Sequence, residues 1–519
     1  MESKRKKFNI IANFIGGGWT ALMGLVFIPV YIKYLGIYSY GVIGIYGSLQ
    51  IWFTLLDMGL SPTINREMSR FAAGAVSKKD IHDTLKTIEV IYVIMSIMIG
   101  VSVIAGSRWL ATTWLKLGPL STDTVTHSLM IVGYIIAIRW MSTIYKSAIQ
   151  GLQNQVWLNI FTSIMATIRS VGSALLLAFF FRSLELFFAF QAISYTIEMF
   201  VLYFRIHSYL PPLTNKAEIR LGLLRSAKGF IAGIGVIGIM STILTQLDKL
   251  LLSRMVTLAD FGYYALASSV AGALYILVGP ISNVAYPRFT ALVTMGDEKT
   301  LAQEYHHFVQ LLSIALMPAS LILVLFSRTI LMLWTGSTQL ASIVGPILEI
   351  LAIGNLFNGL THVPYMAQLA FGWYRLKLAF LLIATAVAVP ALFVFIPKYG
   401  IQAAAWTWLC VNLSMLLIEV PIMHSRIFQN ELKQWALVDT CLPLTIAFLV
   451  VYLGRQIYVH KFIPINSVAT SLFMFTLLIL STLGTALVTP LGKDKMRTII
   501  ISLKNDGGLK NILYKWGRK

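Results

Sequence analysis

The sequence predicts an all-α integral membrane protein with about fourteen transmembrane helices. Of its 519 residues, 57% are hydrophobic and only 12% are charged, and the mean hydropathy is +0.77, more than a water-soluble core requires. The apolar blocks are about 20 to 28 residues long, the length at which a helix crosses about 30 Å of hydrocarbon. The short alternating segments of a transmembrane β-barrel are not seen.

Charged borders separate the apolar blocks into fourteen expected spans. They run approximately over residues 9–34, 40–65, 84–106, 124–150, 156–181, 183–208, 228–252, 259–287, 303–327, 341–371, 375–397, 400–424, 436–458 and 465–490. The first block is too long for a signal peptide and is not closed by a small-x-small cleavage site. An even number of spans places both ends of the chain on one side of the membrane.

The distribution of Lys and Arg indicates which side that is. With the N-terminus inside, the inner segments hold 28 of the 41 cations and the outer borders hold 9. Inner loops of membrane proteins are enriched in Lys and Arg. We therefore predict a multi-pass membrane protein with both termini cytoplasmic.

A weak internal repeat appears when the chain is shifted by 221 residues. "KYLGIYSYGVIG" from Lys33 then lies over "RMVTLADFGYYA" from Arg254, which matches Gly41 with Gly262. Both stretches join the first and second spans of a six-span unit. We predict two six-helix lobes related by a pseudo-twofold repeat, 1–210 and 215–425, then two additional helices over 436–490 and a basic cytoplasmic tail over 491–519. In such an arrangement a substrate path lies between the repeats.

Four cations fall within the expected spans, where each is costly and is a functional candidate by default. They are Arg139, Lys146, Arg169 and Lys249. Arg139 and Lys146 are seven residues apart, which places them on one face of a helix. Arg169 lies on the next, antiparallel span at a depth similar to that of Arg139. Lys146 is nearer the cytoplasmic edge, so it is either an entrance charge or a side chain that reaches to the interface.

Several acidic and amide groups also lie in the spans. Asp57 follows Gln50 by seven residues on the second span, Glu198 lies in the inner third of the sixth, and Asp248 adjoins Lys249 on the seventh. Asp57 and Glu198 are candidates for exchange of H⁺ or Na⁺. A structural ion pair with Arg139 or Arg169 is an equally open interpretation.

Other classes of chemistry find no support in the sequence. The net charge of +20 follows mostly from the topological bias beside anionic lipids, so we expect no nucleic-acid partner. There is no Gly-rich phosphate loop, nucleophile elbow or metal-spaced His/Cys cluster. Cys410 and Cys441 are too far apart for a metal motif. We expect no enzyme activity, no catalytic residues, no metal and no cofactor.

Three motifs resemble a known family. They are "LLDMGLSPTINREMSR" (55–70), "AIQGLQNQVWLN" (148–159) and "QLDKLLLSRMVTLADFGYYALA" (246–267). Together with the fourteen-span layout they resemble the polysaccharide-transporter branch of the multidrug/oligosaccharidyl-lipid/polysaccharide exporter superfamily, specifically the O-antigen lipid flippases. Asp57, Gly59 and Arg66 match the first motif, Gly151 the second, and Asp248 with Lys249 the third. Arg139 and Arg169 match none.

The resemblance implies two six-helix lobes around a cavity that opens alternately to each side. It implies a substrate made of an oligosaccharide on undecaprenyl pyrophosphate, flipped from the cytoplasmic to the periplasmic leaflet, with basic groups that accommodate the pyrophosphate. Arg139, Arg169, Lys146 and Lys249 are the expected substrate-binding residues. Besides membrane lipids, a polymerase and a chain-length regulator of the same pathway are expected partners.

Two alternatives remain at this stage. A cation-coupled multidrug exporter of the same superfamily would use an acidic cavity, for which Asp57 and Glu198 are available; the central Arg pair argues against it. A membrane glycosyltransferase or O-antigen polymerase would be expected to have a large outer loop, and the outer loops of this chain are short.

Overall fold

The computed structural model describes the backbone of residues 2–57, 59–212, 217–220, 228–460 and 467–494, and the side chains of these ranges except those of 2–12, 14 and 228–237. Within these residues every regular element is a helix. The chain divides into two compact units, residues 1–266 with 381–404, and residues 267–380 with 405–519.

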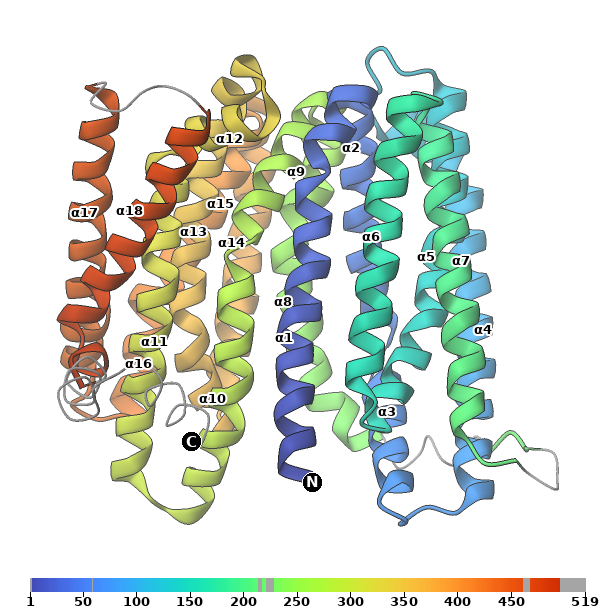
Figure 1. Ribbon diagram of the computed structural model, residues 1–519, viewed down its shortest axis with the longest axis horizontal. Coiled ribbons are helices and arrows are strands. Elements are labelled where there is room, and N and C mark those ends of the chain that lie inside the picture. The colour runs from blue at the N-terminus through green and yellow to red at the C-terminus, as the bar shows by residue number, and fades with distance from the viewer. Residues whose placement is uncertain (1, 58, 213–216, 221–227, 461–466, 495–519) are drawn as a thin grey trace, which may run out of the picture. The chain divides into compact units, whose positions relative to one another are not determined.

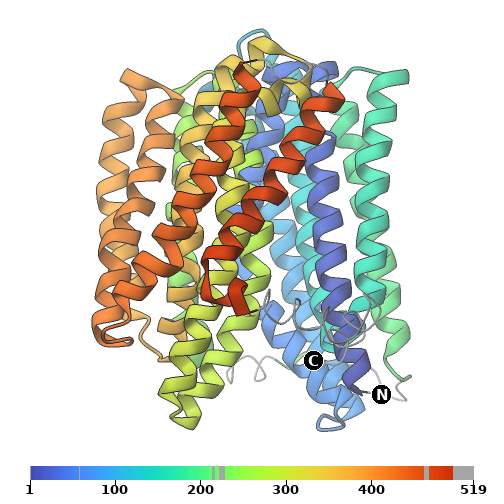
Figure 2. The ribbon, with the colours of Figure 1, turned by 60° about the vertical axis from the view of Figure 1, so that its left-hand side comes forward.

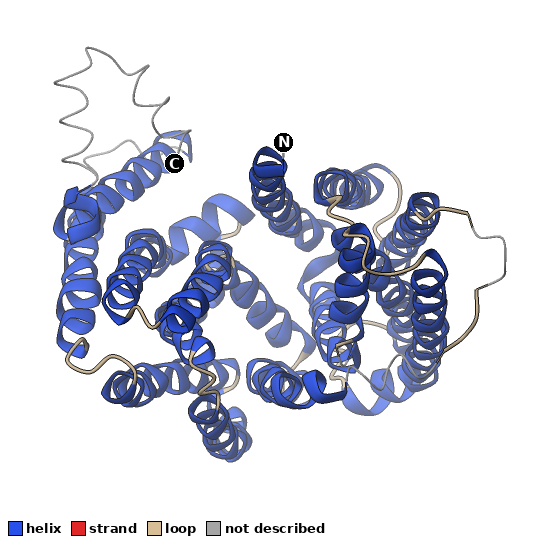
Figure 3. Ribbon diagram, turned by 90° about the horizontal axis from the view of Figure 1, so that it is seen from below, coloured by secondary structure: helices blue, strands red, loops and turns tan. Residues whose placement is uncertain are grey.

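The first unit is a bundle of long helices, drawn mostly in blue and green (Figure 1). Its elements are α1 (Glu2–Val26), α2 (Ile28–Thr54), α3 (Leu60–Ala72), α4 (Lys78–Trp109), α5 (Thr122–Gly151), α6 (Gln155–Phe179), α7 (Leu184–Tyr209), α8 (Lys228–Met255), the first part of α9 (Leu258–Gly272) and most of α14 (Arg375–Tyr399). The central helix is α5, which packs against α3, α4 and α7. Figure 3 shows these helices end on.

The second unit is organised around α11 and α13. Its further elements are α10 (Tyr275–Met295), α11 (Glu298–Leu325), α12 (Ser327–Thr335), α13 (Thr338–Ala370), most of α15 (Ile401–Ser414), α16 (Val420–Arg426), α17 (Leu442–Val459) and α18 (Ser467–Val488). α11 packs against α10, α13, α17 and α18. The last two helices lie side by side, toward the viewer in Figure 2.

The predicted all-helical membrane fold is confirmed. Eleven helices within the described residues are long and apolar enough to cross a membrane, or twelve if the bent pair α9 and α10 counts as one span. The total of fourteen is not confirmed, because the side chains of α1 and α8 are described only in part. Most of the other expected spans coincide with single helices or with helices that include a π-helical segment, as at 415–419 and 434–441.

Serine and aspartate side chains begin several of these helices. Ser77, Ser121, Ser183 and Ser337 each precede a helix and accept a hydrogen bond from the backbone N–H three residues later. Asp297 does the same for α11, with 3.0 Å between its Oδ1 and the N of Thr300. These caps satisfy N–H groups that the first helical turn leaves free.

The structure departs from the expected spans within α2, at the C-terminal end of α2 and at α9. Gly36 has φ 81° and ψ 166° and interrupts α2, where we expected the turn between the first two spans. The second span ends at Thr54 and not at residue 65. A short 3₁₀ turn and Gly59, at φ 82°, separate it from the amphipathic helix α3. The single span expected over 259–287 is two helices that meet at 45°.

The internal repeat is visible as a reciprocal contact in the first unit. A Cβ added to Gly41 would lie 2.3 Å from the carbonyl oxygen of Leu258, and one added to Gly262 would lie 2.6 Å from that of Ile37. The shift of 221 residues that matches Gly41 with Gly262 also matches Ile37 with Leu258. The two matched glycines therefore make equivalent close contacts with each other's segment, as a local twofold relation requires.

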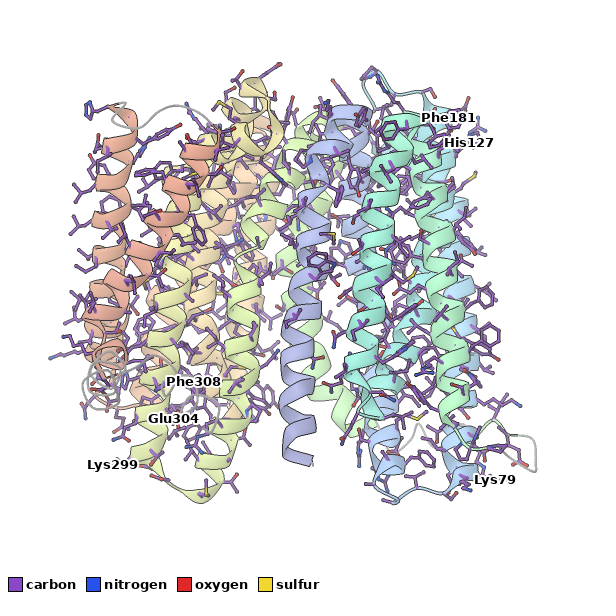
Figure 4. The ribbon with its side chains drawn as sticks, viewed as in Figure 1. Lys79, His127, Phe181, Lys299, Glu304 and Phe308 are labelled. Carbon is purple, nitrogen blue, oxygen red and sulfur yellow. The ribbon has the colours of Figure 1, made fainter. Side chains whose placement is uncertain are left out.

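Figure 4 locates the ends of each unit separately. In the first unit Lys79 lies at one end, and His127 and Phe181 lie at the opposite end; that the Lys79 end is cytoplasmic stays a prediction from the cation bias. In the second unit Lys299, Glu304 and Phe308 lie toward one end. The lobe boundaries near residue 210 and in the 425–436 region stay predictions, and the basic tail from residue 495 onward lies outside the described residues.

Candidate functional site

Arg139, in the middle of α5, is bound by two tyrosines from neighbouring helices. Its Nη1 donates to the hydroxyl of Tyr46 on α2, at 2.7 Å, and to that of Tyr195 on α7, at 2.8 Å. Its guanidinium carbon lies 4.6 Å from the centre of the Tyr195 ring. Among the described residues no carboxylate forms an ion pair with Arg139. The charge is thus held by neutral phenols and ring faces, which stabilise a cation without neutralising it.

Arg169 and Lys146 share one carboxylate, that of Glu198 on α7. Nζ of Lys146 lies 2.7 Å from Oε1 of Glu198, and Nη1 of Arg169 contacts Oε2. The Glu198 side chain is 1% exposed, against 11% for Arg169 and 36% for Lys146. A buried carboxylate is costly unless it is paired, and here both oxygens are paired.

Tyr195 links the two halves of this arrangement. Its ring centre lies 4.2 Å from the guanidinium carbon of Arg169 and 4.6 Å from that of Arg139. It precedes Glu198 by three residues, so both face the same side of α7. The six residues Tyr46, Arg139, Lys146, Arg169, Tyr195 and Glu198 form what we call the cation cluster. With three cations and one carboxylate, it carries a formal charge of +2.

The helices that carry the cation cluster are adjacent in the first unit. α7 packs against α5 and α6, and α2 packs against the same two helices; α5, α6 and α7 run side by side (Figure 1). The expected side-chain positions follow from helix geometry, because Arg139 and Lys146 are two turns apart on one face. Of the eight site residues predicted from the sequence, the structure brings together Arg139, Lys146, Arg169 and Glu198.

Asp57 has a local partner set of its own. Its Oδ1 accepts hydrogen bonds from the N–H and the hydroxyl of Ser61, at 3.2 and 2.7 Å, and from the hydroxyl of Tyr92. These bonds fix the first turn of α3. Gln50 lies half-buried on α2, one turn after Tyr46 and on the same face.

Asp248 and Lys249 form a separate polar site on α8. Asp248 accepts from the hydroxyl of Tyr264 and, at 2.7 Å, from the backbone N–H of Lys249. Nζ of Lys249 donates to Oε1 of Gln246 at 3.4 Å. Lys249 also lines a cavity of about 230 Å³ in the company of three tryptophans, Trp52, Trp109 and Trp114. Within the described residues, the hydrogen bonds of Asp248 and Lys249 do not reach the cation cluster.

The second unit has a buried ion pair that sequence reasoning missed. Nζ of Lys377 lies 3.0 Å from Oε2 of Glu419, whose Oε1 accepts from Gln368 at 3.1 Å. The charge bias places Lys377 at an inner border, but only 9% of it is exposed. Glu419 ends a π-helical segment, 415–419, so a regular helical period does not predict the face that it occupies. One cation and one anion make this site neutral, unlike the cation cluster.

The tyrosines of the cation cluster were also missed. Tyr46 precedes Gln50 by four residues and Tyr195 precedes Glu198 by three, so each lies one helical turn from a polar residue that the sequence singles out. That spacing is the only signal in the sequence. The chain has 22 tyrosines, and the pattern alone does not separate these two from the others.

The fold and the buried charges define a multi-pass helical membrane protein built like known membrane transporters. The structure is similar to that of the lipid II flippase MurJ in an inward closed conformation, with a TM-score of 0.68, 15% identity, and coverage of 91% of this chain and 97% of that one. It is also similar to a MATE multidrug transporter, with a TM-score of 0.60, 12% identity, and coverage of 82% and 96%. At such low sequence identities, the structural similarity establishes the fold alone.

Sequence comparison gives the family. Residues 7–293 match the profile of the family described as polysaccharide biosynthesis proteins, and since this is more than half of the chain, the protein belongs to that family. A candidate O-antigen transporter of Shigella flexneri is 27% identical over 188 residues, which are 36% of this chain and 43% of that relative. The match thus spans less than half of the relative's length. The predicted family resemblance is confirmed.

Proposed function

We propose that the protein flips an oligosaccharide carried on undecaprenyl pyrophosphate from the cytoplasmic to the periplasmic leaflet of the bacterial inner membrane. The observation that carries the proposal is the cation cluster, which combines a formal charge of +2 with an arginine, Arg139, that has no carboxylate partner among the described residues. Membership of the polysaccharide biosynthesis family supports a lipid-linked glycan as the substrate.

The chemistry of a pyrophosphate fits the cation cluster. Excess positive charge within a membrane is expensive, and it persists where it serves an anionic ligand. Arginine keeps its proton in such surroundings and presents a planar fork that binds phosphate oxygens in pairs. Lys146 is more exposed than Arg169, so it places a positive charge nearer the entrance of the site. The polyprenyl tail remains in the bilayer while the polar head crosses, so no bond is broken.

In this proposal the head group crosses by alternating access. The cation bias supports a cytoplasmic location for both termini, and a pseudo-twofold repeat is the usual basis of two alternately open states. Coupling to H⁺ or Na⁺ is part of the proposal, with Asp57 or Glu198 as the exchanging carboxylate. Transport in proteoliposomes that depends on neither a H⁺ nor a Na⁺ gradient would refute the ion coupling. It would not affect the proposal that the protein is a flippase.

The alternative of a multidrug exporter for cationic drugs is disfavoured by the sign of the charge. Of the four ionised groups in the cation cluster, three are positive, so a cationic drug would be repelled. A fold likeness to a MATE transporter does not alter this electrostatic argument. Drug resistance on overexpression, with surface glycan unchanged on deletion, would support the exporter instead.

The test replaces both arginines in cells that depend on this protein for a surface glycan. The double variant Arg139→Ala/Arg169→Ala should insert into the membrane at normal levels and abolish the surface glycan. Arg288→Ala is the matched control, because Arg288 is an exposed arginine paired with Glu304 at 2.9 Å, and it should leave the glycan at wild-type level. Full glycan in the double variant would refute the assignment of the cation cluster as the substrate site.

A further inference from the structure

Glu198 is the only carboxylate in the cation cluster. It forms ion pairs with Lys146 and Arg169, two cations that an anionic ligand would need. Its Oε1 lies 2.7 Å from the ammonium of Lys146, and its Oε2 contacts the guanidinium of Arg169. Arg139 differs, because its two hydrogen bonds go to neutral phenols. An incoming anion can therefore bind Arg139 directly, but it must displace Glu198 to bind the other two.

We propose that Glu198 is an internal competitor of the substrate, which sets how tightly the pyrophosphate is held and allows it to leave. The proposal rests on the proposed function and names the group that controls its release step. A site that carries a ligand across a membrane must bind it well enough to accept it and weakly enough to let it go. Three clustered cations without a carboxylate would hold a dianion too firmly for release.

The formal charges support this role. A pyrophosphate esterified at both ends carries about two negative charges at neutral pH, since each phosphate keeps one ionised oxygen. With Glu198 ionised, the cation cluster has a charge of +2 and balances that dianion. Without Glu198 it would have +3. A monophosphate diester, with one negative charge, would leave one cation uncompensated, so we infer that the cation cluster selects diphosphate over monophosphate lipids.

The geometry favours renewed pairing of the Glu198 carboxylate after the ligand has left. Glu198 and Tyr195 share one face of α7, and the Tyr195 ring packs against both guanidinium groups. The ring keeps the arginines in place while the carboxylate moves away and returns. Because Glu198 is 1% exposed, water cannot readily replace it as a partner of Arg169, which favours its return once the ligand moves on.

Binding and release of a polyprenyl diphosphate test the proposal in the full chain. The protein is placed in nanodiscs of zwitterionic phosphatidylcholine, which supply no competing anionic lipid. It is titrated with a sugar-linked polyprenyl diphosphate and with a sugar-linked polyprenyl monophosphate, the diesters that carry about two negative charges and about one. We expect Glu198→Gln to bind the diphosphate roughly tenfold more tightly and to release it more slowly in a chase. Surface glycan in cells should fall despite the tighter binding. Glu198→Asp keeps a carboxylate on a shorter side chain. Its affinity for the diphosphate and its rate of release should lie between those of wild type and Glu198→Gln.

The outcomes separate the two proposals. A wild-type protein that binds neither lipid refutes the proposed function. A wild-type protein that binds the diphosphate, together with Glu198→Gln and Glu198→Asp variants that bind it more weakly, shows that Glu198 only positions Arg169 and overturns the inference. If Glu198→Gln does not insert, the affinity of Glu198→Asp decides in the same way. Glu349→Gln, which changes a half-buried carboxylate bonded to Ser327 at 2.6 Å, is the control and should bind like wild type.

Discussion

The guanidinium of Arg139 donates a hydrogen bond to the Tyr195 hydroxyl at 2.8 Å and packs 4.6 Å from the centre of the same ring. One tyrosine thus provides both a hydrogen-bond acceptor and a π face to one arginine, and a π face to Arg169 as well. Both guanidinium groups therefore lie against the same ring. The positioning of both arginines should therefore depend on Tyr195.

Two variants of Tyr195 separate its ring from its hydroxyl. Tyr195→Phe removes a hydrogen bond worth about 1 kcal/mol and keeps the π face, so we expect a partial loss of ligand affinity, about threefold to tenfold. Tyr195→Ala also removes the cation–π contacts and should reduce affinity further. Binding of polyprenyl diphosphate measures both. Equal affinity in wild type and Tyr195→Ala would show that the ring does not hold the arginines in their binding positions.

Asp57 is expected to have a structural role, because its carboxylate accepts hydrogen bonds from Ser61 in the first turn of α3. Asp57→Ala should lower the free energy of unfolding by about 1 kcal/mol, because the N–H and hydroxyl of Ser61 lose their acceptor. Asp57→Asn keeps an acceptor oxygen and should be close to wild type in thermal unfolding and in glycan export. Loss of export in a stable Asp57→Asn protein would instead identify Asp57 as a carboxylate that must ionise during transport.

Helical periodicity and charge bias predicted a large part of the fold and four of the six residues of the cation cluster. The seven-residue spacing of Arg139 and Lys146 placed both on one face of a regular helix, and the structure has them in one cluster with Glu198. The same reasoning failed where the helix is irregular. Asp57 lies in a 3₁₀ turn and Glu419 in a π-helical segment, and neither has the period of 3.6 residues on which a face assignment depends.

Burial of charge was the second feature that the sequence did not reveal. Lys377 lies near the start of an apolar segment and matched the pattern of an interfacial cation. Its partner Glu419 is 42 residues away in the sequence, so only the packing of distant helices brings the two together. Tyr46 and Tyr195 are similar cases, because their role depends on a guanidinium supplied by another helix.

The reciprocal contacts of Gly41 and Gly262 predict matched effects of substitution. A Cβ at either position would meet a backbone carbonyl oxygen at 2.6 Å or less, and backbone cannot move aside as a flexible side chain can. Gly41→Ala and Gly262→Ala should each cost about 1 to 3 kcal/mol of stability and reduce glycan export. Gly47→Ala is the control on α2, because a Cβ there meets nothing within 4 Å. Wild-type stability in both test variants would contradict the close approach.

The buried pair Lys377–Glu419 allows a double-mutant test of the second unit. Glu419→Leu alone leaves the Lys377 ammonium buried without its carboxylate and should cost about 3 to 5 kcal/mol of stability. The double variant Lys377→Met/Glu419→Leu removes both charges and should recover most of that loss, since an apolar pair of similar volume replaces the ion pair.

Thermal unfolding in detergent measures this cycle, with the exposed pair Arg288–Glu304 as the control. That pair is 2.9 Å apart but 45% and 27% exposed, so removing Glu304 should cost no more than about 1 kcal/mol. Because the Lys377–Glu419 site is neutral, the double variant should also retain affinity for polyprenyl diphosphate. A double variant as unstable as Glu419→Leu would mean that the two charges are not each other's main partners. A stable double variant that no longer binds the lipid would extend the substrate site into the second unit.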